Sequence, residues 1–159
     1  MTEELNILLQ QHFRDPVPGL TWAAMILRLV FALMFGAALG WEREQHNKAA
    51  GLRTHMMISV AACLFALLTI GLMKDSSIAG DSIRKDPIRL IEAVTAGVAF
   101  LAAGTIFNSG DRVRGLTTGA GMWMAGAIGA ACGLGYLGLA VLAAVMALLV
   151  LWAIRLVVP

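Results

Sequence analysis

The densest cluster of charged side chains spans residues 40–55, between two apolar segments, and contains both signs. Glu42 and Glu44 supply carboxylate oxygens of the kind that bind a divalent cation such as Mg²⁺. Arg43 and Arg53 in the same stretch could neutralise these carboxylates just as well, and exposed ion pairs on a loop contribute little stability. The stretch therefore predicts either a weak cation site or a salt-bridged, solvated turn, and both alternatives stay open.

A second polar cluster spans residues 104–115 and leads into another apolar segment. Thr117 or Thr118 is expected to cap the helix that follows, and the first cluster ends in the same way ahead of its own helix. Exposed backbone N–H groups at such helix starts attract anions, so the phosphate of a lipid or of a soluble molecule is a candidate ligand. Asp111 adds a third weak candidate for a metal ligand. The loop residues expected to carry function are Glu42, Arg43, Glu44, Arg53, Thr54, His55, Asn108, Asp111, Arg114, Thr117 and Thr118.

The elements that position these loops are apolar helices. Hydrophobic residues make up 59% of the 159 residues and charged residues only 14%, and the mean hydropathy is +0.80. Such a chain is too apolar for a soluble domain, and its formal charge of +2 lacks the clustered basic face that nucleic-acid binding requires. We therefore predict an all-α, polytopic membrane protein whose first partner is the lipid bilayer.

About five transmembrane helices are expected, because a spanning helix needs roughly 20 apolar residues. Residues 1–21 form an interfacial segment on the outer face, and residues 22–159 form the five-helix transmembrane domain. The expected spans cover residues 22–40, 56–73, 88–107, 116–134 and 136–158.

The distribution of cations predicts the orientation. With five spans, and with Arg28 and Arg89 left out as membrane-embedded or borderline, six Lys or Arg residues gather on the side of the two loops and four on the other side. The positive-inside rule then places both loops and the C-terminus in the cytoplasm and the N-terminus outside.

Sliding the sequence by 64 residues aligns the two loops and suggests a parallel repeat of helices one–two and three–four. The same offset places Arg28 opposite Glu92, so two opposite charges would lie at the same depth in helices one and three. A charge inside the membrane costs about 2.5 to 3.5 kcal/mol on insertion scales, which pairing relieves. The alternatives are that Arg28 extends to the outer headgroups, or that the pair forms a site for a transported ion or proton.

Small residues recur at four-residue spacing in the fourth span, at Gly121, Ala125, Gly129 and Gly133. Such a stripe lets two helix backbones approach closely. It predicts either internal packing or a homodimer that shares the stripe. Enzymatic activity is not expected, because the sequence shows no nucleophile with a base, no metal-ligand constellation and no phosphate loop.

Several separate motifs with matching spacing resemble the MgtC/SapB family of membrane proteins. They are Glu42-Arg43-Glu44, the stretch Ala49-Ala50-Gly51-Leu52-Arg53-Thr54-His55, Asp86-Pro87 with Arg89-Leu90, Gly104-Thr105-Ile106, and Arg114-Gly115-Leu116-Thr117-Thr118 with Trp123. The resemblance covers helices one to four in order. Many family members continue into a C-terminal ACT-type domain, which the sequence to Pro159 does not include, and the family more often has Gln where this chain has Glu92.

The resemblance implies a bacterial inner-membrane protein with an outward N-terminus, linked to growth at low magnesium and to survival in acidic host compartments. Some members bind and regulate the membrane ATP synthase, and the older suggestion for the family is direct magnesium transport. The function expected for this chain is therefore a regulator of another membrane complex, and the alternative is a small Mg²⁺ transporter or channel. No cofactor is expected beyond Mg²⁺ as a ligand. A transporter needs a polar path, and beyond Arg28, Glu92, Thr95 and Thr105 the spans offer few groups to line one.

Overall fold

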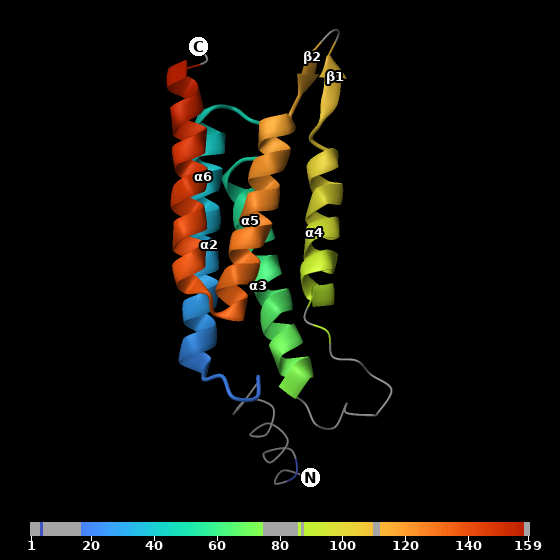
Figure 1. The fold of residues 1–159 in the computed structure, drawn as a ribbon, viewed down its shortest axis with the longest axis vertical. Coiled ribbons are helices and arrows are strands. Elements are labelled where there is room, and N and C mark those ends of the chain that lie inside the picture. The colour runs from blue at the N-terminus through green and yellow to red at the C-terminus, as the bar shows by residue number, and fades with distance from the viewer. Residues whose placement is uncertain (1–3, 5–16, 75–85, 87, 110–111, 158–159) are drawn as a thin grey trace.

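The computed structural model describes residue 4 and residues 17–74, 86, 88–109 and 112–157. Most of the interfacial segment expected over residues 1–21 lies outside the described residues. The described chain forms a helical bundle with one short hairpin at its end (Figure 1), so the predicted all-α fold class is confirmed. The elements are α2 (Trp22–Gln45), α3 (Leu52–Lys74), α4 (Ile88–Ala103), β1 (Phe107–Ser109), β2 (Arg112–Arg114), α5 (Leu116–Leu134) and α6 (Leu137–Val157).

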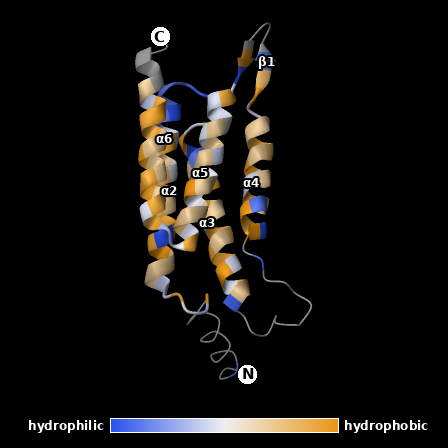
Figure 2. Cartoon of the chain, viewed as in Figure 1, coloured by the Kyte–Doolittle hydropathy of each residue, from blue (hydrophilic) through white to orange (hydrophobic). Residues whose placement is uncertain are grey.

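Two helices, α2 and α3, are long and apolar enough to span a bilayer, with 24 and 23 residues. Hydrophobic residues cover most of the bundle along its length (Figure 2). By contrast, α4 has 16 residues, which corresponds to about 24 Å and is shorter than a hydrocarbon core of about 30 Å. The other three spans therefore stay sequence predictions.

The helices begin and end differently from the predicted spans near the loops. Residues 40–45 continue α2 and residues 52–55 already belong to α3, so the connection between them is only residues 46–51. The third span was predicted to reach residue 107, but α4 ends at Ala103 and Phe107 begins the β1–β2 hairpin, in which Phe107 pairs with Arg114 and Ser109 with Arg112. This hairpin was not expected from the sequence.

The centre of the bundle is the contact of α3 with α2 and α5, and glycines allow it. A Cβ on Gly129 of α5 would lie 2.8 Å from the Cα of Ser59, and one on Gly133 would lie 3.0 Å from the Cα of Cys63. On the other side of α3, a Cβ on Gly36 of α2 would lie 2.8 Å from the carbonyl oxygen of His55. No side chain fits between these backbones, so the three helices pack directly on one another.

This packing favours the internal use of the small-residue stripe. Gly121, Ala125, Gly129 and Gly133 are all buried within the bundle, with Gly129 and Gly133 facing α3. The homodimer through this stripe stays a prediction.

Two features of the proposed repeat can be compared with the structure. Helices α3 and α5 begin at Leu52 and Leu116, 64 residues apart, at the offset that aligned the sequence. Their preceding helices differ, because α2 continues to Gln45 whereas α4 ends at Ala103. The two halves therefore diverge where their loops begin.

Candidate functional site

The two predicted functional loops lie at the same end of the bundle (Figure 1). We call this the loop end; it comprises residues 46–51, the β1–β2 hairpin and the adjoining helix turns. In the part of the chain that the structure describes, the buried polar or charged side chains are Arg43, His55, Ser59 and Thr118. They come from the last turns of α2, the first two turns of α3 and the first turn of α5. The bundle thus gathers its buried polar groups at the loop end.

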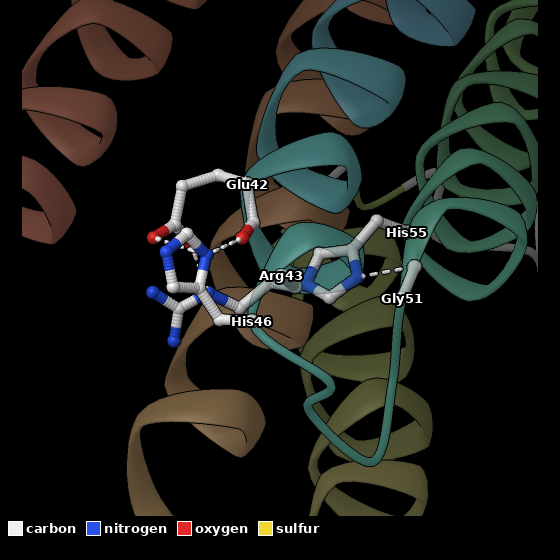
Figure 3. Close-up of polar contacts among 5 residues, drawn as sticks. All are labelled: Glu42, Arg43, His46, Gly51 and His55. Carbon is white, nitrogen blue, oxygen red and sulfur yellow. Dashed lines mark hydrogen bonds and ion pairs between the residues drawn. The ribbon is translucent and has the colours of Figure 1, made fainter.

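Arg43 is a buried cation in the last turns of α2, with 4% of its surface exposed. Its Nε donates to the carboxylate of Glu42. The other oxygen of that carboxylate lies 3.8 Å from Nδ1 of His46, and the same Nδ1 donates to the carbonyl oxygen of Glu42 at 2.6 Å. Figure 3 shows the Glu42 carboxylate beside both basic side chains. Its charge is therefore balanced within one helix turn.

His55 in the first turn of α3 is fully buried. Its Nδ1 lies 2.9 Å from the carbonyl oxygen of Gly51 (Figure 3), and since a carbonyl only accepts, Nδ1 carries the hydrogen. The neutral ring then presents a lone pair at Nε2, and this atom has no hydrogen-bond partner among the described residues. A Cβ on Gly121 of α5 would lie 3.1 Å from it. An unsatisfied buried acceptor is unusual and marks a candidate functional position.

Glu44 stabilises the start of α3. Its Oε2 accepts a hydrogen bond of 2.9 Å from the backbone N–H of Leu52, the first residue of that helix. A carboxylate at this position satisfies an otherwise free N–H group and complements the positive end of the helix dipole. A Cβ on Gly51 would collide with the same carboxylate, so a larger residue there would have to displace Glu44 from the N–H of Leu52.

The start of α5 differs from the prediction that Thr117 or Thr118 caps it. The residue before the helix is Gly115, with φ of +91°, and no side chain caps it. Both threonines lie inside the first turn, where Thr117 is exposed and Thr118 is buried. The capping prediction was wrong because the helix begins at Leu116, two residues earlier than a cap at Thr117 requires.

The carboxylates proposed as metal ligands are engaged elsewhere. Glu42 is paired with Arg43 and Glu44 accepts from Leu52, while Asp111 lies outside the described residues. Over the described ranges, no group of three or more His, Cys, Asp or Glu side chains could hold a metal ion. Of the two interpretations of residues 40–55, the geometry favours the ion-paired turn.

The other predicted site residues lie on the surface of the loop end. Arg53 is exposed and Thr54 is half-buried in the first turn of α3, and Asn108 and Arg114 are exposed on the hairpin strands. These side chains are available to a partner, whereas Arg43 and His55 are not.

The structure does not bring Arg28 and Glu92 together. Nη1 of Arg28 donates a hydrogen bond of 2.8 Å to the carbonyl oxygen of Gly133, in the last turn of α5. Glu92 is exposed on α4, and no ion pair joins these two described residues. The predicted charge pair was wrong because the end of α5, rather than α4, meets the guanidinium.

Sequence analysis missed Ser59, whose hydroxyl donates to the carbonyl oxygen of Ala32 at 2.7 Å and so joins α3 to α2. A pattern could have revealed it. His55, Ser59 and Cys63 follow one another at four-residue spacing, and in a helix such residues share a face. This face of α3 is buried in the bundle.

These features define the class of the protein. Apolar helices packed through glycines, with the buried polar groups at one end, form a helical membrane protein. Comparison with known proteins refines this class: the model of the MgtC family matches residues 29–158. The chain belongs to the MgtC family, as its sequence motifs predicted.

Named relatives agree with this assignment. The putative magnesium transporter YhiD of Escherichia coli K12 is 38% identical over 130 residues, covering 81% of this chain and 60% of the relative. The protein MgtC of Brucella abortus is 37% identical over 117 residues, covering 74% of this chain and 45% of the relative. An uncharacterised protein of Synechocystis is 36% identical over 134 residues, covering 84% and 53%. The chain thus spans about half the length of these curated relatives, and no solved structure matches it.

Proposed function

We propose that this chain is the membrane-embedded part of a regulator in magnesium homeostasis that acts, through its loop end, on another membrane complex such as the ATP synthase. Membership of the MgtC family and the magnesium-related name of one relative support the link to magnesium. The position of the buried polar side chains, at the loop end of the bundle, supports regulation rather than transport.

The observation that carries the proposal is the confinement of buried polar side chains to the loop end. Beyond Ser59, the buried side chains of α3 are Ala62, Cys63, Ala66 and Leu67. The facing part of α5 contributes glycines, alanines, an isoleucine and a cysteine. A translocation path for a divalent cation needs polar groups along its length. Within the described residues, the fully buried polar side chains lie at one end only, and the half-buried Arg28 at the other end binds the carbonyl oxygen of Gly133.

The proposal includes a location and an orientation. The chain would cross the bacterial inner membrane several times, with the loop end in the cytoplasm and the N-terminus outside. Among the described residues, Lys48, Arg53 and Arg114 are exposed at the loop end, against Lys74 and Arg89 at the other end. This excess agrees with the positive-inside rule and would place the exposed polar surface where a cytoplasmic or membrane partner can reach it.

The competing function is Mg²⁺ transport, which the name of the Escherichia coli relative favours. Liposomes that contain only the purified chain and an internal Mg²⁺-sensitive dye distinguish the two. We expect no Mg²⁺ entry above that of empty vesicles. Entry that requires the chain would contradict regulation as its primary function.

A growth experiment tests the loop end directly. In cells that depend on this chain at low magnesium, Arg114→Glu reverses an exposed charge on the hairpin, and Arg89→Glu makes the same change at the start of α4. We expect only Arg114→Glu to lose growth support at equal membrane abundance. Equal growth of the two variants would contradict a role for the loop end.

A further inference from the structure

An apolar groove of about 700 Å³ runs between α3 and α4. Small residues form part of its lining, among them Ala61 and Ala62 of α3 and Ala93 and Gly97 of α4. Because none of these side chains fills the space, α4 packs on α5 and leaves a gap beside α3.

The groove opens to the outside of the bundle. Met57, Phe65, Leu68 and Leu72 line it along α3 and have 70%, 54%, 50% and 57% of their surfaces exposed. From Met57 to Leu72 the groove follows α3 for on the order of 22 Å. One leaflet of a bilayer supplies about 15 Å of hydrocarbon, so an acyl chain fits along the groove.

The positively charged side chain of Arg53 lies near the end of the groove that is closest to the loop end. Arg53 precedes Met57 by four residues, so the two side chains are neighbours on α3. Arg53 is exposed, and no described residue forms a hydrogen bond or an ion pair with its side chain. Lys74 at the opposite end is engaged differently, since its Nζ lies beside the turn at Gly19 before α2.

We propose that an anionic phospholipid occupies this groove, with an acyl chain between α3 and α4 and its phosphate at Arg53. The apolar lining matches the acyl chain, and the Arg53 guanidinium, which has no partner among the described residues, matches the headgroup charge. The proposal needs the chain to lie in a bilayer but does not depend on whether the protein regulates or transports.

Gly97 provides a specific test of the groove. A Cβ at this position meets no protein atom within 4 Å, so Gly97→Leu can fill the groove without a clash. Ala93→Leu, one turn earlier on the same lining, is a second filling variant. Gly138→Leu is the matched control, because a Cβ on Gly138 of α6 also meets nothing within 4 Å and this residue lies outside the groove.

The experiment reconstitutes the full chain in vesicles of equal phosphatidylglycerol and phosphatidylcholine, extracts it in mild detergent and counts retained lipids by native mass spectrometry. Trp fluorescence confirms that each variant is folded. We expect wild type and Gly138→Leu to retain one phospholipid, mainly phosphatidylglycerol, and both groove-filling variants to fall to background. Arg53→Gln should lower the preference for phosphatidylglycerol about fivefold, while Arg89→Gln keeps it.

Three results would overturn the proposal. The first is no retained lipid in wild type, and the second is equal retention in wild type and both filling variants. The third is a dimer that Gly97→Leu dissociates while no lipid is bound, which would make a second copy the occupant.

Discussion

Nη1 of Arg28 donates a hydrogen bond of 2.8 Å to the carbonyl oxygen of Gly133 and so joins the first half of α2 to the end of α5. The last carbonyl groups of a helix lack partners within it. Here the N–H groups of Gly135 and Tyr136 bind the carbonyl oxygens of Cys132 and Ala131, and Arg28 binds the next one. A cation at this position also complements the negative end of the helix dipole.

Arg28→Met should therefore destabilise the bundle. The variant keeps an unbranched side chain but leaves the Gly133 carbonyl unsatisfied, so we expect a loss of about 1 to 2 kcal/mol in the free energy of unfolding. Equilibrium unfolding in detergent micelles, followed by Trp fluorescence, measures it. Arg89→Met is the control because Arg89 is exposed, and equal losses in the two variants would contradict the capping role.

Gly129→Ala should disrupt the contact of α5 with α3. Its Cβ would lie 2.8 Å from the Cα of Ser59, and a backbone cannot move aside as a flexible side chain can. Overpacking of this kind costs about 1 to 3 kcal/mol or more. Thermal unfolding in detergent should show a clear loss, whereas Gly97→Ala, which meets no atom, should behave like wild type. A Gly129→Ala variant as stable as wild type would show that α3 and α5 lie further apart than in this structure.

Glu44→Ala should weaken the start of α3. Loss of the carboxylate frees the N–H of Leu52, and removal of a capping side chain typically costs about 1 kcal/mol. Glu92→Ala is the matched control, since Glu92 is exposed on α4. The same unfolding assay tests both variants, and an unchanged free energy of unfolding for Glu44→Ala would contradict this stabilising role.

His55→Leu separates stability from function. The Gly51 carbonyl keeps the backbone N–H of His55 as a donor at 3.2 Å, and the substitution removes the unsatisfied Nε2. We therefore expect a change of no more than about 1 kcal/mol in the free energy of unfolding. Growth support at low magnesium should nevertheless be lost. Normal growth of a folded His55→Leu variant would show that Nε2 has no functional role.

The apolar helices were predictable from the sequence because hydrophobic runs of spanning length are a strong pattern. The internal use of the small-residue stripe was one of two stated alternatives, and the position of α3 against Gly129 and Gly133 favours it. The hairpin was missed because its strands have three residues each, too few for an alternating pattern.

The site was predictable in part. Sequence motifs identified Arg43, Glu44 and His55 but not their roles, because burial and capping depend on how α2 meets α3. The prediction of an Arg28–Glu92 ion pair was wrong for a related reason. A repeat offset compares depth along two helices, and it contains no information on which helices are neighbours.

The absence of side chains between Gly129 and Ser59, and between Gly36 and His55, has a mechanical consequence. Where two backbones are in direct contact, no side chain lies between them that could change rotamer and let the helices slide. We therefore expect α2, α3 and α5 to move as one rigid unit. A conformational response to a partner at the hairpin would then be taken up by α4, which joins the hairpin directly and borders a groove along α3. In this arrangement α4 moves, and the glycine-packed helices α2, α3 and α5 stay fixed.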